Sequence, residues 1–210
     1  MNKLRIFIYG DSNTWGYVPT LDTYTGGDSK TKRYDSESVW WSRLNQEYVL
    51  FVNGNNGRTI ANDHPDYPNK NGLASIDSIM PNEKIDLSII MLGTNDLKDM
   101  YQLSIPDLIN NMKKLIEKID NKYHSKIMLL CPPYIYESPV TKPKYSHGIS
   151  KIDEYEKALL EFTKNNNYLF ASGKICEVGV DGEHLTKKGH NDLGKIVYEE
   201  IKKYEVKLND

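Results

Sequence analysis

The segment Asp86-Leu87-Ser88-Ile89-Ile90-Met91-Leu92 decides the fold class of this 210-residue chain. After Asp86 the segment is apolar apart from one serine. An apolar run that does not alternate with polar residues is typical of a β strand covered on both faces. Such strands lie in parallel sheets between two layers of helices. We therefore expect residues 86–92 to form a strand in the middle of an α/β domain.

Short apolar runs recur on both sides of this segment and alternate with segments of helical period. We expect further strands over residues 4–9, 48–52, 126–131 and 168–171, and a short helix over residues 39–48. Three apolar stripes predict longer helices: Leu108, Ile109, Met112, Leu115, Ile116 and Ile119; Ile152, Tyr155, Ala158, Leu159 and Phe162; and Leu193, Ile196, Val197, Ile201 and Tyr204. This order predicts one three-layer α/β/α domain over residues 1–210, with a central, mostly parallel five-stranded sheet.

Two of these helices carry signals at their first turns. Pro106 suits the first turn of the helix that contains Leu108, because proline has no N–H to leave unpaired there. Ser150, with Asp153 three residues later, resembles a weak capping box at the start of the next helix.

The composition narrows the classes of partner and compartment. The 27 basic and 29 acidic side chains nearly cancel, to a net charge of −2, so nothing indicates nucleic-acid binding. No apolar run is long enough to cross a bilayer, and residues 4–9 suit a first strand rather than a signal peptide. Cys131 and Cys176 are the only cysteines, which favours two buried thiols in a reducing cytoplasm over a disulfide.

Three polar or glycine positions follow three successive strands of the expected sheet. Ser12 follows the first strand, Gly54 the second and Asn95 the third. In parallel sheets the ligand crevice lies beyond the carboxyl ends of the strands, so we expect these residues to meet there. The long connections over residues 19–35, 53–71 and 132–148 are expected to act as lids or partner surfaces.

The two ends of the chain supply the parts of a nucleophilic acyl-transfer site. Ser12 lies in Gly10-Asp11-Ser12-Asn13-Thr14-Trp15-Gly16, and Asp181 and His184 lie three residues apart in Val180-Asp181-Gly182-Glu183-His184-Leu185. A serine hydroxyl needs a base, and histidine, with a reference pKa of about 6.5, can supply one. A carboxylate can then fix the imidazole tautomer.

Each of these residues also has a plainer interpretation. Ser12 can be a turn residue after Gly-Asp, Asp181 a loop carboxylate and His184 a helix-capping histidine. Asp11 is expected to pin the turn rather than to transfer protons. The co-occurrence of a serine, a histidine and a carboxylate at the two chain ends weakens the plainer interpretations.

A tetrahedral oxyanion needs hydrogen-bond donors that are already in place. The backbone N–H groups of Ser12 and Gly54 and the side-chain amide of Asn95 would suit. Asn53-Gly54 can equally be a plain turn, and Asn95 can cap a helix after Gly93-Thr94. Spacing alone leaves these alternatives open.

Four blocks in order, Gly10-Asp11-Ser12, Gly54, Gly93-Thr94-Asn95-Asp96 and Asp181-x-x-His184, resemble those of the SGNH (GDSL) hydrolases. The similarity spans residues 4–204. Within the family, the chain resembles the aryl esterase/acyltransferase branch, and the matching stretches are residues 10–19, 58–59, 89–96 and 179–184. The resemblance implies the SGNH, flavodoxin-like fold. It also implies Ser12 as nucleophile, His184 as base, Asp181 as its partner, and Ser12, Gly54 and Asn95 as the oxyanion hole.

The chain departs from the family pattern beside the nucleophile. Position 13 is Asn where the family usually has Leu, and Tyr17 stands where members that transfer acyl groups efficiently in water carry Trp. The second departure favours hydrolysis over transfer. Asn13, Trp15 and Tyr17 are our candidates for the substrate pocket. Arg58 can steady the loop behind Gly54 or bind an acidic group of the substrate, and we expect the first role. Because the branch often assembles through its long loops, we also expect a homo-oligomer.

The main hypothesis is a serine esterase that hydrolyses small acyl esters of acetyl type through an acyl-enzyme, with no cofactor, no metal, and no nucleic-acid or membrane partner. The first alternative is a carbohydrate O-acetyl esterase of the acetylxylan-deacetylase type, which the polar loops 20–35 and 132–148 would suit. The second is a catalytically silent binding module. A metal-dependent phosphoesterase built on Asp11, Asp96, Asp181 and His184 is disfavoured, because the sequence shows no clustered ligand set.

Overall fold

A five-stranded, all-parallel sheet forms the centre of the computed structural model, which describes residues 3–21, 32–145 and 151–209. The strand order is β2-β1-β3-β4-β5. The bounds are Arg5–Gly10 for β1, Val49–Gly54 for β2, Leu87–Met91 for β3, Lys126–Cys131 for β4 and Leu169–Ser172 for β5. All five expected strands are confirmed, each within two residues of its predicted bounds.

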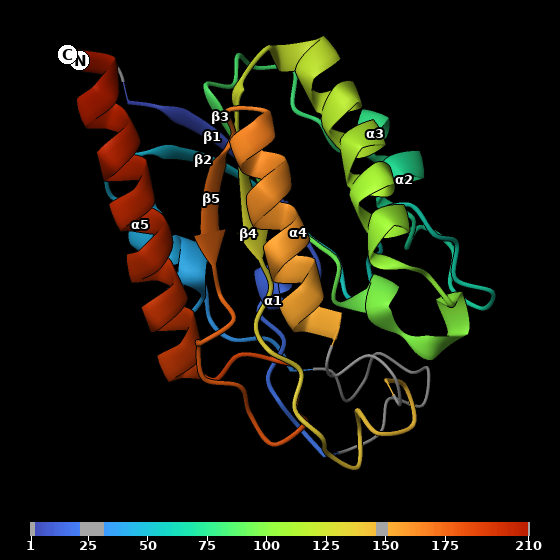
Figure 1. The fold of residues 1–210 in the computed structure, drawn as a ribbon. Helices are drawn as coiled ribbons and strands as arrows, with labels where there is room; N and C mark the ends of the chain where they lie inside the picture. Colours follow the sequence, from blue (N-terminus) through green and yellow to red (C-terminus); the bar gives the residue numbers. More distant parts are fainter. Residues whose placement is uncertain (1–2, 22–31, 146–150, 210) are drawn as a thin grey trace.

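Helices cover both faces of the sheet and complete the three layers (Figure 1). One face carries α2 (Gly72–Ile79), α3 (Ile105–Tyr123) and α4 (Lys151–Asn165). The other carries α5 (Lys187–Asn209) and the 3₁₀ turn η2 (Trp40–Leu44). The short elements α1 (Ser12–Trp15), η3 (Asn95–Leu97) and η4 (Asp99–Tyr101) lie in the connections. The helix expected over residues 39–48 is therefore a five-residue 3₁₀ turn.

The segment that predicted the fold class is buried on both faces, as expected. Leu87, Ile89 and Met91 of β3 pack in the core under α5, while Ile90 packs in the core under α2, α3 and α4. Ser88, the one polar residue of the strand, is fully buried, and its hydroxyl is 2.8 Å from that of Ser125. This hydrogen bond explains how a serine is tolerated inside an apolar strand.

The start of α3 is fixed by its own side chains. Ser104 is the N-cap, and it and Asp107 form a reciprocal capping box. Pro106 lies in the first turn, as predicted. The capping box expected at Ser150 lies outside the described residues. No helix in the described part of the chain combines the length and apolar character needed to span a bilayer.

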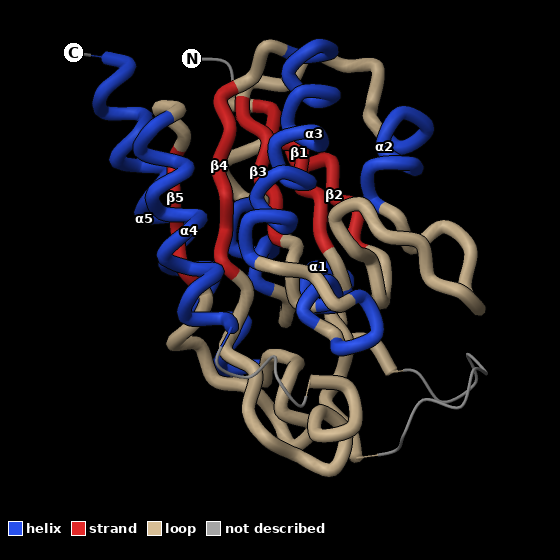
Figure 2. Tube along the Cα trace, turned by 45° about the vertical axis from the view of Figure 1, so that its right-hand side comes forward, coloured by secondary structure: helices blue, strands red, loops and turns tan. Residues whose placement is uncertain are grey.

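The register of the sheet brings the ends of three strands to one level. Gly10 of β1 pairs with Gly54 of β2 and with Met91 of β3. The chain therefore leaves the sheet at neighbouring points before Ser12, Asn55 and Leu92. Figure 2 shows the loops gathered at this lower end of the sheet, with both termini at the opposite end.

Candidate active site

A cavity of about 300 Å³ opens at the carboxyl ends of the strands. It is small enough to match the lower end of the range for small-molecule sites. Its wall consists of Ser12, Tyr17, Thr20, Asn56, Gly57, His64, Tyr67, Lys70, Asn95, Lys98, Val140, Lys144, Asp181, Glu183 and His184. Val140 is the only aliphatic side chain among these residues, so the cavity is lined mainly by polar and aromatic groups.

Ser12 is held at the cavity by the sharp turn between β1 and α1. Asp11 is the N-cap of α1, and its carboxylate accepts a hydrogen bond of 2.9 Å from the backbone N–H of Asn13. This is the turn-pinning role expected for Asp11. Complete burial raises the pKa of Asp11 to about 6. Ser12 is the first helical residue, so its backbone N–H has no partner within α1.

Ser12, His184 and Asp181 form a continuous chain of hydrogen bonds. The Ser12 hydroxyl oxygen is 2.9 Å from Nε2 of His184, and Nδ1 of His184 is 2.8 Å from Oδ2 of Asp181. The other oxygen of Asp181 accepts the backbone N–H of His184 at 3.1 Å. All three residues are buried, with at most 8% of each exposed. The arrangement has the nucleophile–base–carboxylate geometry that acyl transfer requires.

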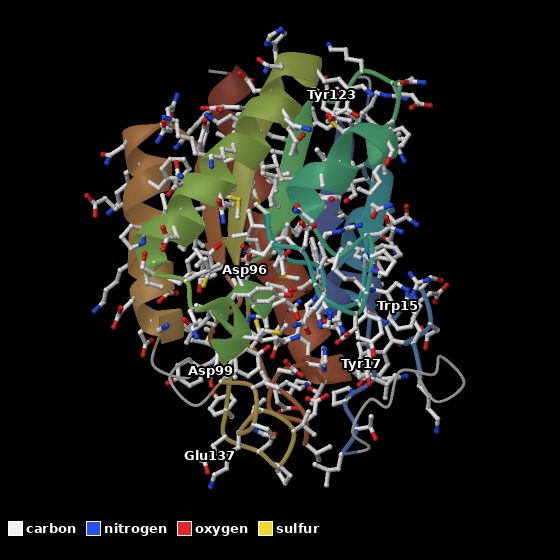
Figure 3. The ribbon with its side chains drawn as sticks, turned by 90° about the vertical axis from the view of Figure 1, so that its right-hand side faces the viewer. Trp15, Tyr17, Asp96, Asp99, Tyr123 and Glu137 are labelled. Atoms are coloured by element: carbon white, nitrogen blue, oxygen red, sulfur yellow. The ribbon has the colours of Figure 1, made fainter. Side chains whose placement is uncertain are left out.

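The three expected pocket residues have different positions. Tyr17 lines the cavity, and its ring stacks on that of His184 with 4.2 Å between centroids. Trp15 does not line the cavity; its carbonyl accepts a hydrogen bond from Arg33, whose guanidinium lies 5.2 Å from the Trp15 ring. Figure 3 shows Trp15 and Tyr17 on the same side of the molecule, near the loop end of the sheet.

Asn13 is a structural link rather than part of the cavity wall. Its side-chain amide donates to the carbonyl of Glu183 at 3.1 Å and accepts from the backbone N–H of Leu185 at 2.9 Å. These two bonds hold the residues on either side of His184. Asn13 was a candidate for the substrate pocket, but it is not among the residues that line this cavity, and both ends of its buried side chain are used for this link.

Asn95 lines the cavity with its side chain fixed at both ends. Its Nδ2 donates to the carbonyl of Arg58 at 3.0 Å, and its Oδ1 accepts a hydrogen bond of 2.6 Å from Nζ of Lys98. The N-cap of η3 is Thr94, so Asn95 is not a helix cap. The second hydrogen of Nδ2 remains available to a ligand.

Gly54 does not reach the cavity wall. A Cβ at Gly54 would lie 2.3 Å from the backbone nitrogen of Trp15, so the glycine permits α1 to pack directly on the end of β2. Gly57, three residues later, lines the cavity instead, with φ of +74°. Its backbone N–H makes no hydrogen bond within the described part of the chain. The second of the four expected blocks therefore reaches the cavity wall through Gly57 and not through Gly54.

Asp96 holds the loop that carries Gly57 in place. Both oxygens of the Asp96 carboxylate accept the backbone N–H of Ile60, and one also accepts from the side chain of Asn62. Figure 3 shows Asp96 closer to the middle of the molecule than Tyr17. Burial raises the pKa of Asp96 to about 7. Asp96 thus ties η3, which begins with Asn95, to the segment around Gly57.

Arg58 has the structural role expected of it. It is 2% exposed and donates to the carbonyls of Gly10 and Asn53 at 2.8 and 2.9 Å. Its guanidinium lies 4.1 Å from the ring centroid of Tyr9. Arg58 therefore joins the ends of β1 and β2 beneath the cavity and does not line it.

A charged cluster that sequence reasoning missed completes the cavity wall. Lys144 donates to one oxygen of Glu183 at 2.8 Å, and the hydroxyl of Tyr145 donates to the other at 2.7 Å. Burial alone would raise the pKa of Glu183, but His184, Lys144 and Lys98 together lower it to about 2. The sequence gives no periodic signal for these residues, because the loops that carry them meet only in the fold. No group of three His, Cys, Asp or Glu side chains in the described ranges is arranged to hold a metal ion.

Comparison with known proteins gives one family match and several similar structures. Residues 8–191 match the model of the GDSL-like lipase/acylhydrolase family. Est24, a carbohydrate acetylesterase from Sinorhizobium meliloti, is 26% identical, with a TM-score of 0.84 over 96% of this chain and 100% of that one. The aryl esterase of M. smegmatis is 27% identical, with a TM-score of 0.85 over 95% and 99% of the two chains.

A third structure supports the fold alone. A putative arylesterase from Agrobacterium tumefaciens is 21% identical, with a TM-score of 0.78 over 95% of this chain and 99% of that one. No protein of curated function matches the chain in sequence.

Proposed function

The chain belongs to the GDSL-like lipase/acylhydrolase family and is a serine esterase, and we propose that Ser12, His184 and Asp181 carry out its reaction on small acyl esters of acetyl type. The observation that carries this assignment is the hydrogen-bonded chain from Ser12 through His184 to Asp181 at a small cavity. A turn serine and a capping histidine would have no reason to meet at 2.9 Å there.

The proposed reaction has two halves. The Ser12 oxygen attacks the ester carbonyl while Nε2 of His184 takes its proton, and His184 then returns that proton to the leaving alcohol. Water attacks the acyl-enzyme in the second half, His184 again removing and returning one proton, and the acid leaves. Asp181 holds Nδ1 of the ring throughout, which keeps Nε2 directed at Ser12.

We propose that the oxyanion is held by the backbone N–H groups of Ser12 and Gly57 and by the side-chain amide of Asn95. All three residues line the cavity. The N–H groups of Ser12 and Gly57 make no hydrogen bond to another described residue, so they can bind an oxyanion without breaking an existing bond. Gly57 replaces Gly54 in this assignment.

The test is hydrolysis of 4-nitrophenyl acetate by wild type and Ser12→Ala, with EDTA present. Residues that act as one unit lose most of the activity when one is removed, so kcat should fall roughly 10⁴- to 10⁶-fold. Labelling by a fluorophosphonate probe should be lost in the same variant. Equal rates in the two proteins would contradict the assignment of Ser12 and revive the metal-dependent or binding-module interpretations.

A second candidate is the deacetylation of carbohydrate O-acetyl groups. The cavity wall combines tyrosine rings with polar side chains, which suits a sugar, and the similar Est24 structure is described as a carbohydrate acetylesterase. Acetylated xylose and cephalosporin C should be compared with aryl acetates by kcat/KM. A clear preference for the sugar ester would establish this candidate, and a clear preference for the aryl acetates would reject it.

The setting of the enzyme is also part of the proposal. We propose a cytoplasmic homo-oligomer that needs no cofactor and has neither nucleic acid nor membrane as a partner. Cys131 and Cys176 are both buried, free thiols, as the cytoplasmic placement would require. A monomeric mass in light scattering would contradict the oligomer, and recovery of the native protein outside the cytoplasmic fraction would contradict the placement.

A further inference from the structure

The charged side chains of the cavity wall are not all hydrogen-bonded to one another. Asp181 binds His184, and Glu183 binds Lys144 and Tyr145. Lys98 also lines the cavity, and neither of these carboxylates forms a hydrogen bond with it.

Lys98 has only a neutral hydrogen-bond partner among the described residues. Its one hydrogen bond in the described structure goes to the neutral Oδ1 of Asn95, at 2.6 Å. No carboxylate among the described residues lies within 4 Å of its Nζ. Two N–H groups of the ammonium therefore remain for a ligand in the cavity. Burial lowers the pKa of Lys98 and the charge of Lys144 adds to that effect, while the carboxylates of Glu183, Asp11 and Asp96 oppose it without contacting the ammonium directly.

An ammonium that is removed from water without a counter-ion costs free energy. The cost is recovered when an anion binds, and a charge-assisted hydrogen bond in a confined site is stronger than one in water. A neutral ester offers Lys98 only a carbonyl or hydroxyl oxygen. An ester that also bears a carboxylate offers a counter-ion in direct contact, which no described carboxylate supplies.

We propose that the substrate of this esterase carries a carboxylate in addition to its ester group, and that Lys98 binds that carboxylate. The inference rests on the proposed function, because it places the anion beside the Ser12 site. Since Asn95 lies between Lys98 and the proposed oxyanion site, the carboxylate is held a few bonds from the scissile carbonyl. It can belong to the acyl part or to the alcohol part of the ester.

Two matched pairs of esters test the proposal and separate these sources. Monomethyl succinate and its neutral amide, methyl succinamate, place the charge in the acyl part. 4-Acetoxybenzoate and 4-acetoxybenzamide place it in the alcohol part. The readout is the ratio of kcat/KM for the acid to that for the amide. One charge-assisted hydrogen bond should make this ratio about 10 or more in one pair.

Lys98 is tested by the same ratio in Lys98→Met, where it should fall toward 1. The ratio, rather than the rate, is informative because the loss of Lys98 also frees Oδ1 of Asn95 and slows both esters of a pair. Lys98→Arg should retain part of the preference. Lys142→Met is the matched control: Lys142 is exposed, pairs with Glu137 and lies outside the cavity wall, so the ratio should stay at the wild-type value.

Wild-type measurements keep the proposal testable if a variant does not fold. Benzoate should inhibit hydrolysis of 4-nitrophenyl acetate competitively and more strongly than benzamide. Ratios near 1 in both pairs, or a preference that survives in Lys98→Met, would overturn the inference while Ser12-dependent hydrolysis of the neutral esters left the proposed function intact. Hydrolysis that does not depend on Ser12 would instead overturn the proposed function.

Discussion

At the scale of single residues, Asn13 controls how the two ends of the chain meet. It follows the proposed nucleophile, and its side chain is bonded on both sides of His184, to Glu183 and to Leu185. The sequence marked Asn13 as a departure from a usual leucine and as a candidate for the substrate pocket. Its role depends on a contact between residues 172 positions apart. A spacing argument gives no access to such a contact.

Replacement of Asn13 by alanine should weaken both stability and catalysis. The variant leaves a buried carbonyl and a buried N–H unpaired, which should lower the free energy of unfolding by about 2 kcal/mol. A displaced His184 should lower kcat about 10- to 100-fold, with little change in KM, because the base moves away from Ser12. Urea unfolding and steady-state kinetics on 4-nitrophenyl acetate measure the two effects.

Asn110→Ala provides the control for this prediction. Asn110 is an exposed residue of α3, remote from the cavity wall, and its replacement should leave both quantities near their wild-type values. An Asn13→Ala protein with wild-type kcat would show that the Ser12–His184 geometry does not depend on this link.

The residue scale also shows which parts of the site a sequence can predict. The meeting of Ser12, Asp181 and His184 could be predicted because their residue types are chemically specific and their blocks are ordered along the chain. The glycine that lines the cavity could not be predicted, because Asn-Asn-Gly after β2 contains several backbone N–H groups and only the turn decides which one faces the cavity. Lys98 carries no signal of its own, since a lysine in a polar loop is ordinarily solvated.

At the scale of secondary-structure elements, the contact between α1 and β2 positions Ser12, the proposed nucleophile. The first turn of α1 lies directly on Gly54 at the end of β2, with the backbone of Trp15 where a side chain would otherwise be. Four residues are too few to show a helical period, so α1 could not be predicted from the pattern. The helix α2 was also missed, although Asn71 caps it, because it follows a long polar loop.

Gly54→Ala should therefore displace α1 as a unit. The added methyl group meets backbone atoms of Trp15 and Thr14 at 2.3 to 2.8 Å, which flexible side chains cannot relieve. Overpacking of this kind typically costs about 1 to 3 kcal/mol, and the urea midpoint should fall accordingly. The kcat for 4-nitrophenyl acetate should fall as well, because Ser12 begins the displaced helix.

Gly173→Ala is the comparison for this element. It follows β5, and its added methyl group would come no closer than 3.1 Å to its neighbours, so the loss of stability should be smaller and kcat nearly unchanged. If Gly54→Ala unfolds at the wild-type urea concentration, α1 does not rest on the end of β2 as the structure has it.

At the scale of the whole molecule, the same crevice that gathers the proposed catalytic groups also encloses ionisable side chains. The β-α order and the unbroken apolar strand predicted the layers correctly, because both follow from local pattern. The carboxyls of Asp11 and Asp96 end up fully enclosed beneath the site, and burial raises the pKa of both. No local pattern indicates this, since each aspartate stands in an ordinary turn sequence.

These buried carboxyls make stability depend on pH in a defined direction. The pKa of Asp96 is about 7 in the folded protein and about 3.8 when unfolded, so the folded state holds the proton more tightly. Its contribution to stability is present below pH 4 and is lost as pH rises through 7. His190, whose pKa burial lowers to about 4, acts in the opposite direction between pH 4 and 6.5. The difference in free energy of unfolding between wild type and a variant is therefore more informative than the free energy of unfolding of wild type alone.

The free energy of unfolding of wild type should decrease relative to that of Asp96→Asn by about 2 to 3 kcal/mol between pH 5 and pH 8. Asparagine cannot ionise. The variant therefore keeps the part of the free energy of unfolding that wild type loses when the Asp96 carboxyl gives up its proton. Urea unfolding of both proteins at several pH values measures this change. Asp120→Asn, which alters an exposed carboxyl of α3, should keep a constant difference from wild type over the same range. A constant difference for Asp96→Asn as well would mean that the three hydrogen bonds from Ile60 and Asn62 keep Asp96 ionised throughout.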